Sequence, residues 1–225
     1  MFSSEVIFTF LTLSLLEVVL GIDNLIFIAL VVQDLPARYN KSARIIGLSL
    51  AFLIRIIMLL SASWVMSLTK PIFSVLSAKD ILLLIGGGFL AINGSIELIA
   101  DFKQIEKQKN IKIANSFITA ILQIAFIDFL FSFDSILTAI GLTLNIPVII
   151  AAIGVSMFAM LFTANSLAAF LKKYPNYKII GIGFIILVGF ALIFEGLHIH
   201  FDKNYLYAVL LAAIAFETFR SLRAK

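Results

Sequence analysis

Long runs of apolar residues alternate with short polar segments along almost the whole chain. A strand in a globular protein has about 3–10 residues, whereas a membrane span needs about 20, so runs of this length favour membrane-spanning helices. The four prolines lie between the runs or at their edges, where helices begin and end. The pattern predicts seven helices, near residues 6–32, 43–66, 81–100, 116–140, 147–170, 179–197 and 205–220.

The composition agrees with a lipid bilayer as the solvent. Hydrophobic residues make up 62% of the 225 residues and charged residues only 13%, whereas a soluble domain has about 25% charged residues. We therefore expect an all-α polytopic membrane bundle that forms a single transmembrane domain over residues 1–225. The absence of cysteine excludes disulfides and thiolate metal sites, and the modest net charge of +4 does not suggest nucleic-acid binding.

The basic residues are distributed unequally between the two sides that the predicted helices define. Thirteen of the seventeen follow the first, third, fifth and seventh helices, three lie on the opposite side, and Arg55 lies inside the second helix. The thirteen are Arg38, Lys41, Arg44, Lys103, Lys107, Lys109, Lys112, Lys172, Lys173, Lys178, Arg220, Arg223 and Lys225, and the three are Lys70, Lys79 and Lys203. Positive residues stay on the cytoplasmic side, so we expect the N-terminus outside and the C-terminus in the cytoplasm.

Two segments share one acidic pattern: an acid, five residues, a second acid and a small polar residue, at a constant offset of 111. The residues are Glu17, Asp23 and Asn24 in the first predicted helix, and Asp128, Asp134 and Ser135 in the fourth. The second copy lies three helices after the first, so the two copies run in opposite directions through the membrane. This arrangement predicts an inverted three-helix repeat, with one copy near 6–100, the second near 116–197, and a seventh helix near 205–220.

The four carboxylates occur at matching positions of the two copies, and this favours a functional role over a purely structural one. An ionised carboxylate at the bilayer centre costs at least about 2.5 kcal/mol, so we expect such residues to be retained only where they have a role. On an ideal helix Glu17 and Asn24 share a face, while Asp23 lies about 120° away. The first helix would turn all three inward more easily if it loosened at Gly21, since glycine weakens a helix by about 1 kcal/mol.

An antiparallel pair of these helices would bring Glu17 level with Asp134, and Asp23 level with Asp128. With Asn24 and Ser135, the acids would form an oxygen-rich cage suited to a hard divalent cation such as Mn²⁺, Mg²⁺ or Ca²⁺. Like charges this close favour protonation of some carboxyls when the cation is absent. Metal binding would then release protons, which is a thermodynamic basis for antiport and a hypothesis here.

Four further polar residues are candidates for charge partners or gates. Arg55 lies deep in the second predicted helix, where it would balance one of the acids, either competing with the ion or forming a structural salt bridge. Glu97 and Glu195 lie near the ends of the third and sixth helices, where they would gate or relay ions unless they are merely solvated. His198 lies in the short loop before the seventh helix, and a plain surface role is the alternative to metal capture.

The segments Glu17–Leu30, EVVLGIDNLIFIAL, and Asp128–Leu142, DFLFSFDSILTAIGL, resemble the two signatures of the TerC family of bacterial membrane proteins. The resemblance extends over essentially the whole chain and is closest to the short branch that holds only the membrane domain. It implies metal homeostasis, especially manganese efflux across the bacterial cytoplasmic (inner) membrane. It also implies that the six residues of the acidic repeat hold the transported ion, with no tightly bound cofactor.

Two other classes of function are compatible with the sequence. An intramembrane aspartyl protease also needs two transmembrane aspartates, which Asp23 and Asp134 would supply, but that function leaves Glu17 and Asp128 unexplained. A membrane-protein assembly or stress-resistance factor would bind a stable partner and tolerate Asp23→Asn. We expect a transporter and not an enzyme. Because the sequence contains no nucleotide-binding motif, an ion gradient or a partner would drive transport.

Overall fold

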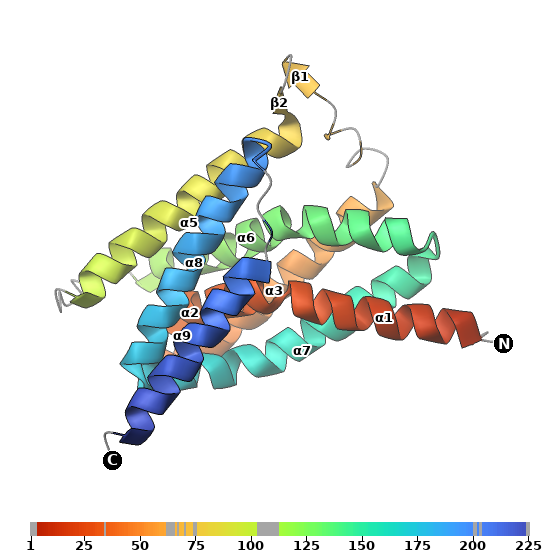
Figure 1. The fold of residues 1–225 in the computed structure, drawn as a ribbon. Helices are drawn as coiled ribbons and strands as arrows, with labels where there is room; N and C mark the ends of the chain where they lie inside the picture. The colour runs from red at the N-terminus through yellow and green to blue at the C-terminus, as the bar shows by residue number, and fades with distance from the viewer. Residues whose placement is uncertain are drawn as a thin grey trace. The chain divides into compact units, whose positions relative to one another are not determined.

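The structure is a computed structural model that describes residues 4–33, 35–61, 66, 68–69, 71–73, 76–102, 113–199, 202 and 204–223. These residues form helices and one short hairpin (Figure 1). The chain divides into two compact units. Unit 1 comprises Met1–Lys70 and Lys112–Ala168, and unit 2 comprises Pro71–Ile111 and Ala169–Lys225.

Unit 1 is organised around one long helix, α6 (Ile113–Leu142). Its main neighbour is α3 (Ala37–Leu60), and α1 (Ser4–Leu20) and α2 (Ile22–Gln33) also contact it. The approach of α3 to α6 is close at Gly47, where an added Cβ would lie 3.0 Å from the Ile124 side chain. Helix α7 (Ile146–Lys173) also contributes to unit 1, which contains its residues up to Ala168.

Unit 2 contains the antiparallel strands β1 (Pro71–Phe73) and β2 (Leu76–Ser77), which the hydrophobic pattern did not predict. Pro71 lies opposite Ser77 and Phe73 lies opposite Leu76. The helices of unit 2 are α5 (Ala78–Phe102), α8 (Pro175–Gly196) and α9 (Asn204–Arg223). The hairpin therefore leads directly into the first turn of α5.

Glycines set the close packing of α5 against α8. An added Cβ at Gly189 would lie 2.7 Å from the backbone nitrogen of Ala91 and 2.8 Å from the carbonyl oxygen of Gly87. Both atoms belong to the backbone, so neither can move without shifting a helix. Small residues at such contacts let two helices approach closely inside a membrane, where lipid is as apolar as leucine.

The lengths of the helices fit membrane spans. Six helices within the described ranges have between 20 and 28 residues, and α1 and α2 together are long and apolar enough for one further span, with a bend of 46° between them. A 20-residue helix is about 30 Å long, which is the thickness of the hydrocarbon core. The prediction of an all-α polytopic membrane bundle is confirmed.

The predicted helix boundaries are correct to within a few residues, except for the second helix. The sequence predicted residues 43–66, but α3 begins at Ala37 and ends at Leu60, where Ser61 leaves helical geometry with φ −98° and ψ 29°. Residues 62–65 lie outside the described residues. The early start has a physical reason: long basic side chains such as Lys41 can extend toward the interface while their backbone remains helical.

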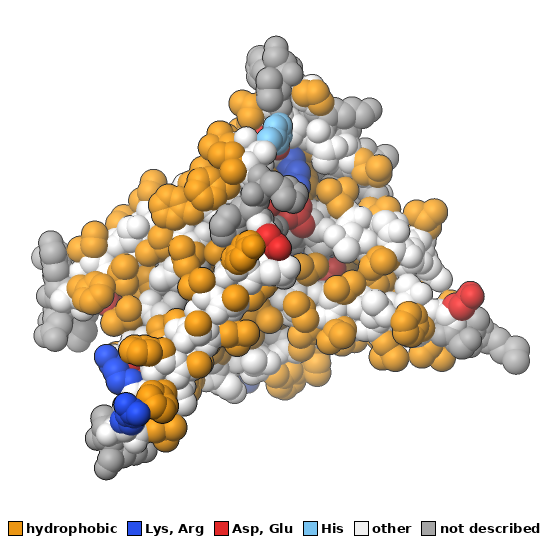
Figure 2. All heavy atoms as spheres, in the orientation of Figure 1, with side chains coloured by type: hydrophobic (Ala, Val, Ile, Leu, Met, Phe, Trp, Pro, Cys, Tyr) orange, Lys and Arg blue, Asp and Glu red, His pale blue; other side chains and the backbone are white. Residues whose placement is uncertain are grey.

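The exposed surfaces of the helices are rich in large hydrophobic side chains (Figure 2). On α1, Phe8 is 71% exposed and Leu15 is 66% exposed, and on α9, Leu211 is 66% exposed and Phe216 is 69% exposed. Burying a side chain of this kind contributes about 1.5–3 kcal/mol, so exposing so many of them to water would be very unfavourable. Lipid chains are the solvent that these faces require.

The candidate ion site and the family

The first signature lies at a break between two helices. Helix α1 ends at Leu20 and α2 begins at Ile22, which confirms the expected loosening at Gly21. A Cβ at Gly21 would meet the terminal methyl group of Met160 on α7, so an added side chain would force this flexible methionine to shift. The bend lets residues from both helix segments become buried: Glu17 is 3% exposed and Asn24 is 1% exposed.

The second signature lies in the middle of α6, which is continuous. Asp128, Ser132 and Ser135 are spaced so that all three lie on one face of the helix, and all are buried. The Ser132 hydroxyl donates to the backbone carbonyl of Asp128 and lies 3.3 Å from Asp128 Oδ2. Ser132 was not identified as a site residue from the sequence. Its position four residues after Asp128 places both side chains on one helix face and could have indicated the contact.

Arg55 of α3 joins the two signatures. Its Nε and Nη2 each donate to one carboxylate oxygen of Asp128 at 2.8 Å, which makes a bidentate pair. Its Nη1 donates to Glu17 Oε2 at 2.8 Å and lies 3.4 Å from Ser135 Oγ. Arg55 is only 2% exposed and Asp128 only 1%, so these ion pairs are shielded from water. Charge-assisted hydrogen bonds of this kind are about twice as strong as neutral ones.

Asn24 completes the group of residues that we call the Arg55 network: Glu17, Asn24, Arg55, Asp128 and Ser135. The Asn24 Nδ2 donates to Asp128 Oδ1 at 3.2 Å. Within the described part of the chain, the buried Asn24 Oδ1 has no hydrogen-bond partner. An unsatisfied buried acceptor costs about 1–3 kcal/mol. The Asn24 oxygen is therefore suited to bind a cation or to accept a hydrogen bond.

The structure thus brings four of the six predicted ion-site residues together, with a guanidinium at their centre. Asp23 is buried at 8% exposure and Asp134 is half-buried. Both make interactions of their own, and neither is a free carboxylate. Among the described residues, no three His, Asp or Glu side chains are grouped closely enough to hold a metal ion. The carboxylates of Glu17 and Asp128 are both paired with Arg55 in this conformation, and its single positive charge offsets one of their two negative charges.

The candidate gates lie in unit 2, and each has a charged partner. Glu97 accepts a hydrogen bond from Lys178 at 3.1 Å, and Glu195 accepts one from Lys79 at 3.0 Å. His198 Nε2 lies 3.0 Å from Asp80 Oδ2. Sequence reasoning did not identify these partners, although opposite charges at the ends of predicted helices were a signal for them.

Asp80 also forms a capping box with Ser77 at the start of α5. The backbone nitrogen and the hydroxyl of Ser77 each donate to Asp80 Oδ2 at 2.7 Å, and the Asp80 nitrogen donates back to Ser77 Oγ at 3.1 Å. These bonds satisfy amide groups that a helix N-terminus leaves without partners. The carboxylate that contacts His198 is therefore the same one that caps the N-terminus of α5.

Apolar helices of membrane-spanning length and a buried charged network within one unit define a polytopic integral membrane protein with a polar interior. The family described as "Integral membrane protein TerC family" matches residues 2–225. The chain belongs to the TerC family, and the resemblance of its two signatures is confirmed.

Bacterial relatives align with most of the chain. The "UPF0053 protein" of Haemophilus influenzae is 43% identical over 203 residues, which cover 87% of this chain and 85% of the relative. The "UPF0053 inner membrane protein YgdQ" of Escherichia coli K12 is 40% identical over 218 residues, covering 95% of this chain and 92% of the relative. The "UPF0053 inner membrane protein YoaE" of the same strain is 36% identical over 217 residues, which are only 42% of its length. No solved structure matches the chain.

Proposed function

We propose that this chain is a transporter of divalent metal ions that exports manganese through the six residues of the acidic repeat, four of which belong to the Arg55 network. The observation that carries the proposal is the buried, unpartnered Asn24 Oδ1 beside the carboxylate of Asp128. Amide and carboxylate oxygens are ligands that suit Mn²⁺, Mg²⁺ and Ca²⁺. Ionisable residues inside a membrane are costly, and they commonly mark ion pathways.

The contacts within the network support the proposed inverted repeat. Adding the offset of 111 converts Glu17 into Asp128 and Asn24 into Ser135. Asn24 contacts Asp128, and Ser135 lies beside the Arg55 group that binds Glu17. The offset therefore relates the pair Asn24 and Asp128 to the pair Ser135 and Glu17. A two-fold axis in the membrane plane would require such a relation.

Arg55 acts in this proposal as a built-in competitor of the ion. Its single positive charge offsets one of the two negative charges of Glu17 and Asp128, and its guanidinium donates hydrogen bonds to both when no metal is bound. A divalent cation would replace the guanidinium at these oxygens, and the return of Arg55 would help to release the cation. Proton release from neighbouring carboxyls on metal binding would couple the cycle to a proton gradient.

We further propose that the protein lies in the bacterial inner membrane with its N-terminus outside and its C-terminus in the cytoplasm. Two relatives carry "inner membrane protein" in their names. Counting the bent α1–α2 pair as one span gives an odd number of spans, which places most basic residues on one side. The cysteine-free sequence permits a direct test. A membrane-impermeant maleimide should label Thr69→Cys from outside intact cells, and Tyr174→Cys only after lysis.

Metal transport can be tested in proteoliposomes with an internal dye that Mn²⁺ quenches. The wild type should carry Mn²⁺, while Asp23→Asn and Asp134→Asn should abolish the flux and retain the folded helix content. Asp202→Asn is the matched control, because Asp202 is an exposed aspartate that bonds only locally to the Asn204 nitrogen among the contacts described. A wild type that moves none of Mn²⁺, Mg²⁺, Ca²⁺ or Zn²⁺ under any imposed gradient would overturn the proposal and favour the assembly-factor hypothesis.

A further inference from the structure

A second buried arginine lies on α3, outside the Arg55 network. Arg44 is only 7% exposed, yet its Nε and Nη1 have no hydrogen-bond partner among the described residues. Positively charged groups are almost never buried unless they are paired. Exposed Lys41 lies one turn nearer the N-terminus of α3 and adds a second positive charge. Among the residues that the structure describes, neither Arg44 nor Lys41 forms a recorded ion pair with a carboxylate.

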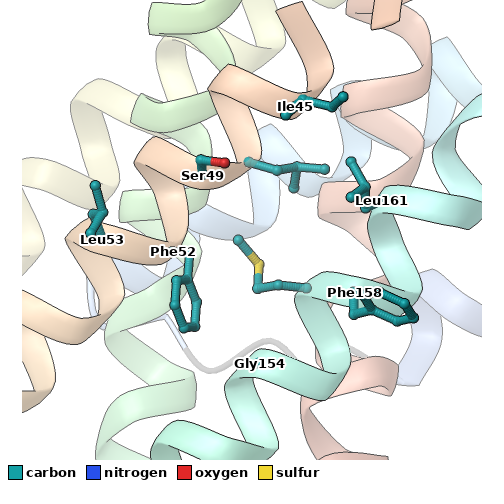
Figure 3. Close-up of a pocket in the computed structure, with 9 residues that line it drawn as sticks. Ile45, Ser49, Phe52, Leu53, Gly154, Phe158 and Leu161 are labelled. Carbon is teal, nitrogen blue, oxygen red and sulfur yellow. The ribbon is translucent and has the colours of Figure 1, made fainter. Parts of the chain in front are cut away.

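An apolar groove of about 400 Å³ lies between α3 and α7 (Figure 3), and its lining on α3 begins at Ile45, the residue after Arg44. Eight of the nine residues that line it are nonpolar. Leu48 belongs to this lining and lies four residues after Arg44, so the two share a helix face. Gly154 lines the opposite wall, where an added Cβ would meet nothing within 4 Å. The groove is open enough to accept a flexible hydrocarbon chain from the side.

The depth of the groove matches one leaflet of a bilayer. Arg44 precedes Arg55 by eleven residues, which is about 16 Å along a helix. Half of the hydrocarbon core is about 15 Å thick. If the Arg55 network lies near the midplane, Arg44 lies at the boundary between hydrocarbon and headgroups. The lining residues of α3 between positions 45 and 53 then extend about 12 Å inward from that boundary.

We infer that Arg44 and the α3–α7 groove form a binding site for one anionic phospholipid. The phosphate accepts hydrogen bonds from the Arg44 guanidinium after the side chain turns outward, because its unpaired Nε and Nη1 are enclosed in this conformation. Lys41 adds attraction, and one acyl chain fills the groove. Asn40, one turn before Arg44, has a buried Oδ1 without a hydrogen-bond partner in the described structure. A headgroup with hydroxyl donors, such as that of phosphatidylglycerol, would satisfy this acceptor as well. The inference does not depend on the proposed transport function.

Native mass spectrometry of the purified full chain tests the site directly. The protein is incubated with phosphatidylglycerol or with phosphatidylcholine carrying the same acyl chains, and retained lipid is counted. The wild type should retain one phosphatidylglycerol about tenfold more strongly than phosphatidylcholine, the usual scale of a charge-assisted pair. Arg44→Gln should remove this preference, and Arg44→Lys should keep part of it because the charge remains.

Filling the groove provides an independent test that does not alter any charge. Gly154→Leu places a side chain in open space, so the protein should fold while retained lipid of both kinds falls at least about tenfold. Gly183→Leu on α8 is the matched control, since a Cβ there also meets nothing within 4 Å and Gly183 does not line the groove. Lys172→Gln controls for nonspecific loss of a basic residue. Equal retention of both lipids by the wild type, or an unchanged preference in Arg44→Gln, would overturn the inference.

Discussion

Replacing Arg55 by glutamine should destabilise the protein more than any other removal of a single charge from unit 1. Arg55 binds Asp128 through two hydrogen bonds and Glu17 through a third, all at 2.8 Å. The Arg55→Gln variant leaves two buried carboxylates without their cation. Removing one partner of a buried ion pair costs about 3–5 kcal/mol, and Arg55 serves two partners, so we expect about 5 kcal/mol.

The neutral triple variant Glu17→Gln, Arg55→Gln, Asp128→Asn separates charge from packing. It removes both anions together with the cation, so no ion remains buried without compensation. Replacing a complete buried ion pair by hydrophobic residues of similar volume is often neutral or stabilising, and the amides introduced here can still hydrogen-bond to one another. We therefore expect the triple variant to recover most of the loss, although it should not transport metal ions, because the ligand carboxylates are gone.

Thermal unfolding in nanodiscs, followed by circular dichroism, measures these differences. For a chain of this size 1 kcal/mol corresponds to about 2–4 °C, so Arg55→Gln should unfold about 10–20 °C below the wild type. Arg220→Gln is the control: its side chain is 59% exposed, and Glu217 keeps a 2.7 Å hydrogen bond from Asn176. That control should change stability by less than about 1 kcal/mol. An Arg55→Gln shift no larger than the control, or a triple variant less stable than Arg55→Gln, would refute the reasoning.

Three further pairs of substitutions test local contacts in stability measurements of the same kind. Gly189→Ala should cost about 1–3 kcal/mol because its Cβ would meet the α5 backbone, whereas Gly183→Ala should be neutral or stabilising by up to about 1 kcal/mol; equal effects would contradict the proposed close contact. Ser77→Ala should cost about 1 kcal/mol by removing the α5 cap, and Ser95→Ala, which loses only a bond to the preceding turn, should cost less. Gly21→Ala and Met160→Ala should be coupled by at least about 0.5 kcal/mol, and strictly additive effects would exclude their contact.

The helices could be predicted because the bilayer imposes a minimum length on each apolar run. The same reasoning located the weak point at Gly21, where a glycine separates Glu17 from Asp23. The β1–β2 hairpin could not be predicted in this way. Strands of three and two residues are too short to produce a periodic pattern, and their pairing depends on local turn geometry.

The residues that form the site were easier to predict than the contacts between them. Intramembrane acids are visible in any hydropathy pattern, and Arg55 stood out as their candidate charge partner. Sequence alone could not show that one guanidinium binds two carboxylates, since that depends on how α3 lies along α6. The pairs of Glu97 with Lys178 and of Glu195 with Lys79 depend in the same way on the packing within unit 2.

Arg55 makes two equivalent positions of the acidic repeat unequal. The offset of 111 relates Glu17 to Asp128, but a single guanidinium presents two parallel donors to Asp128 and one donor to Glu17. One hydrogen bond breaks more readily than a bidentate pair, so Glu17 is the carboxylate that releases Arg55 first. In the proposed cycle an incoming cation would then bind Glu17 while Arg55 still holds Asp128, and only afterwards reach Asp128 and the free oxygen of Asn24. A preference for one direction of ion transport can therefore arise from a single arginine within an otherwise symmetric pattern of acids.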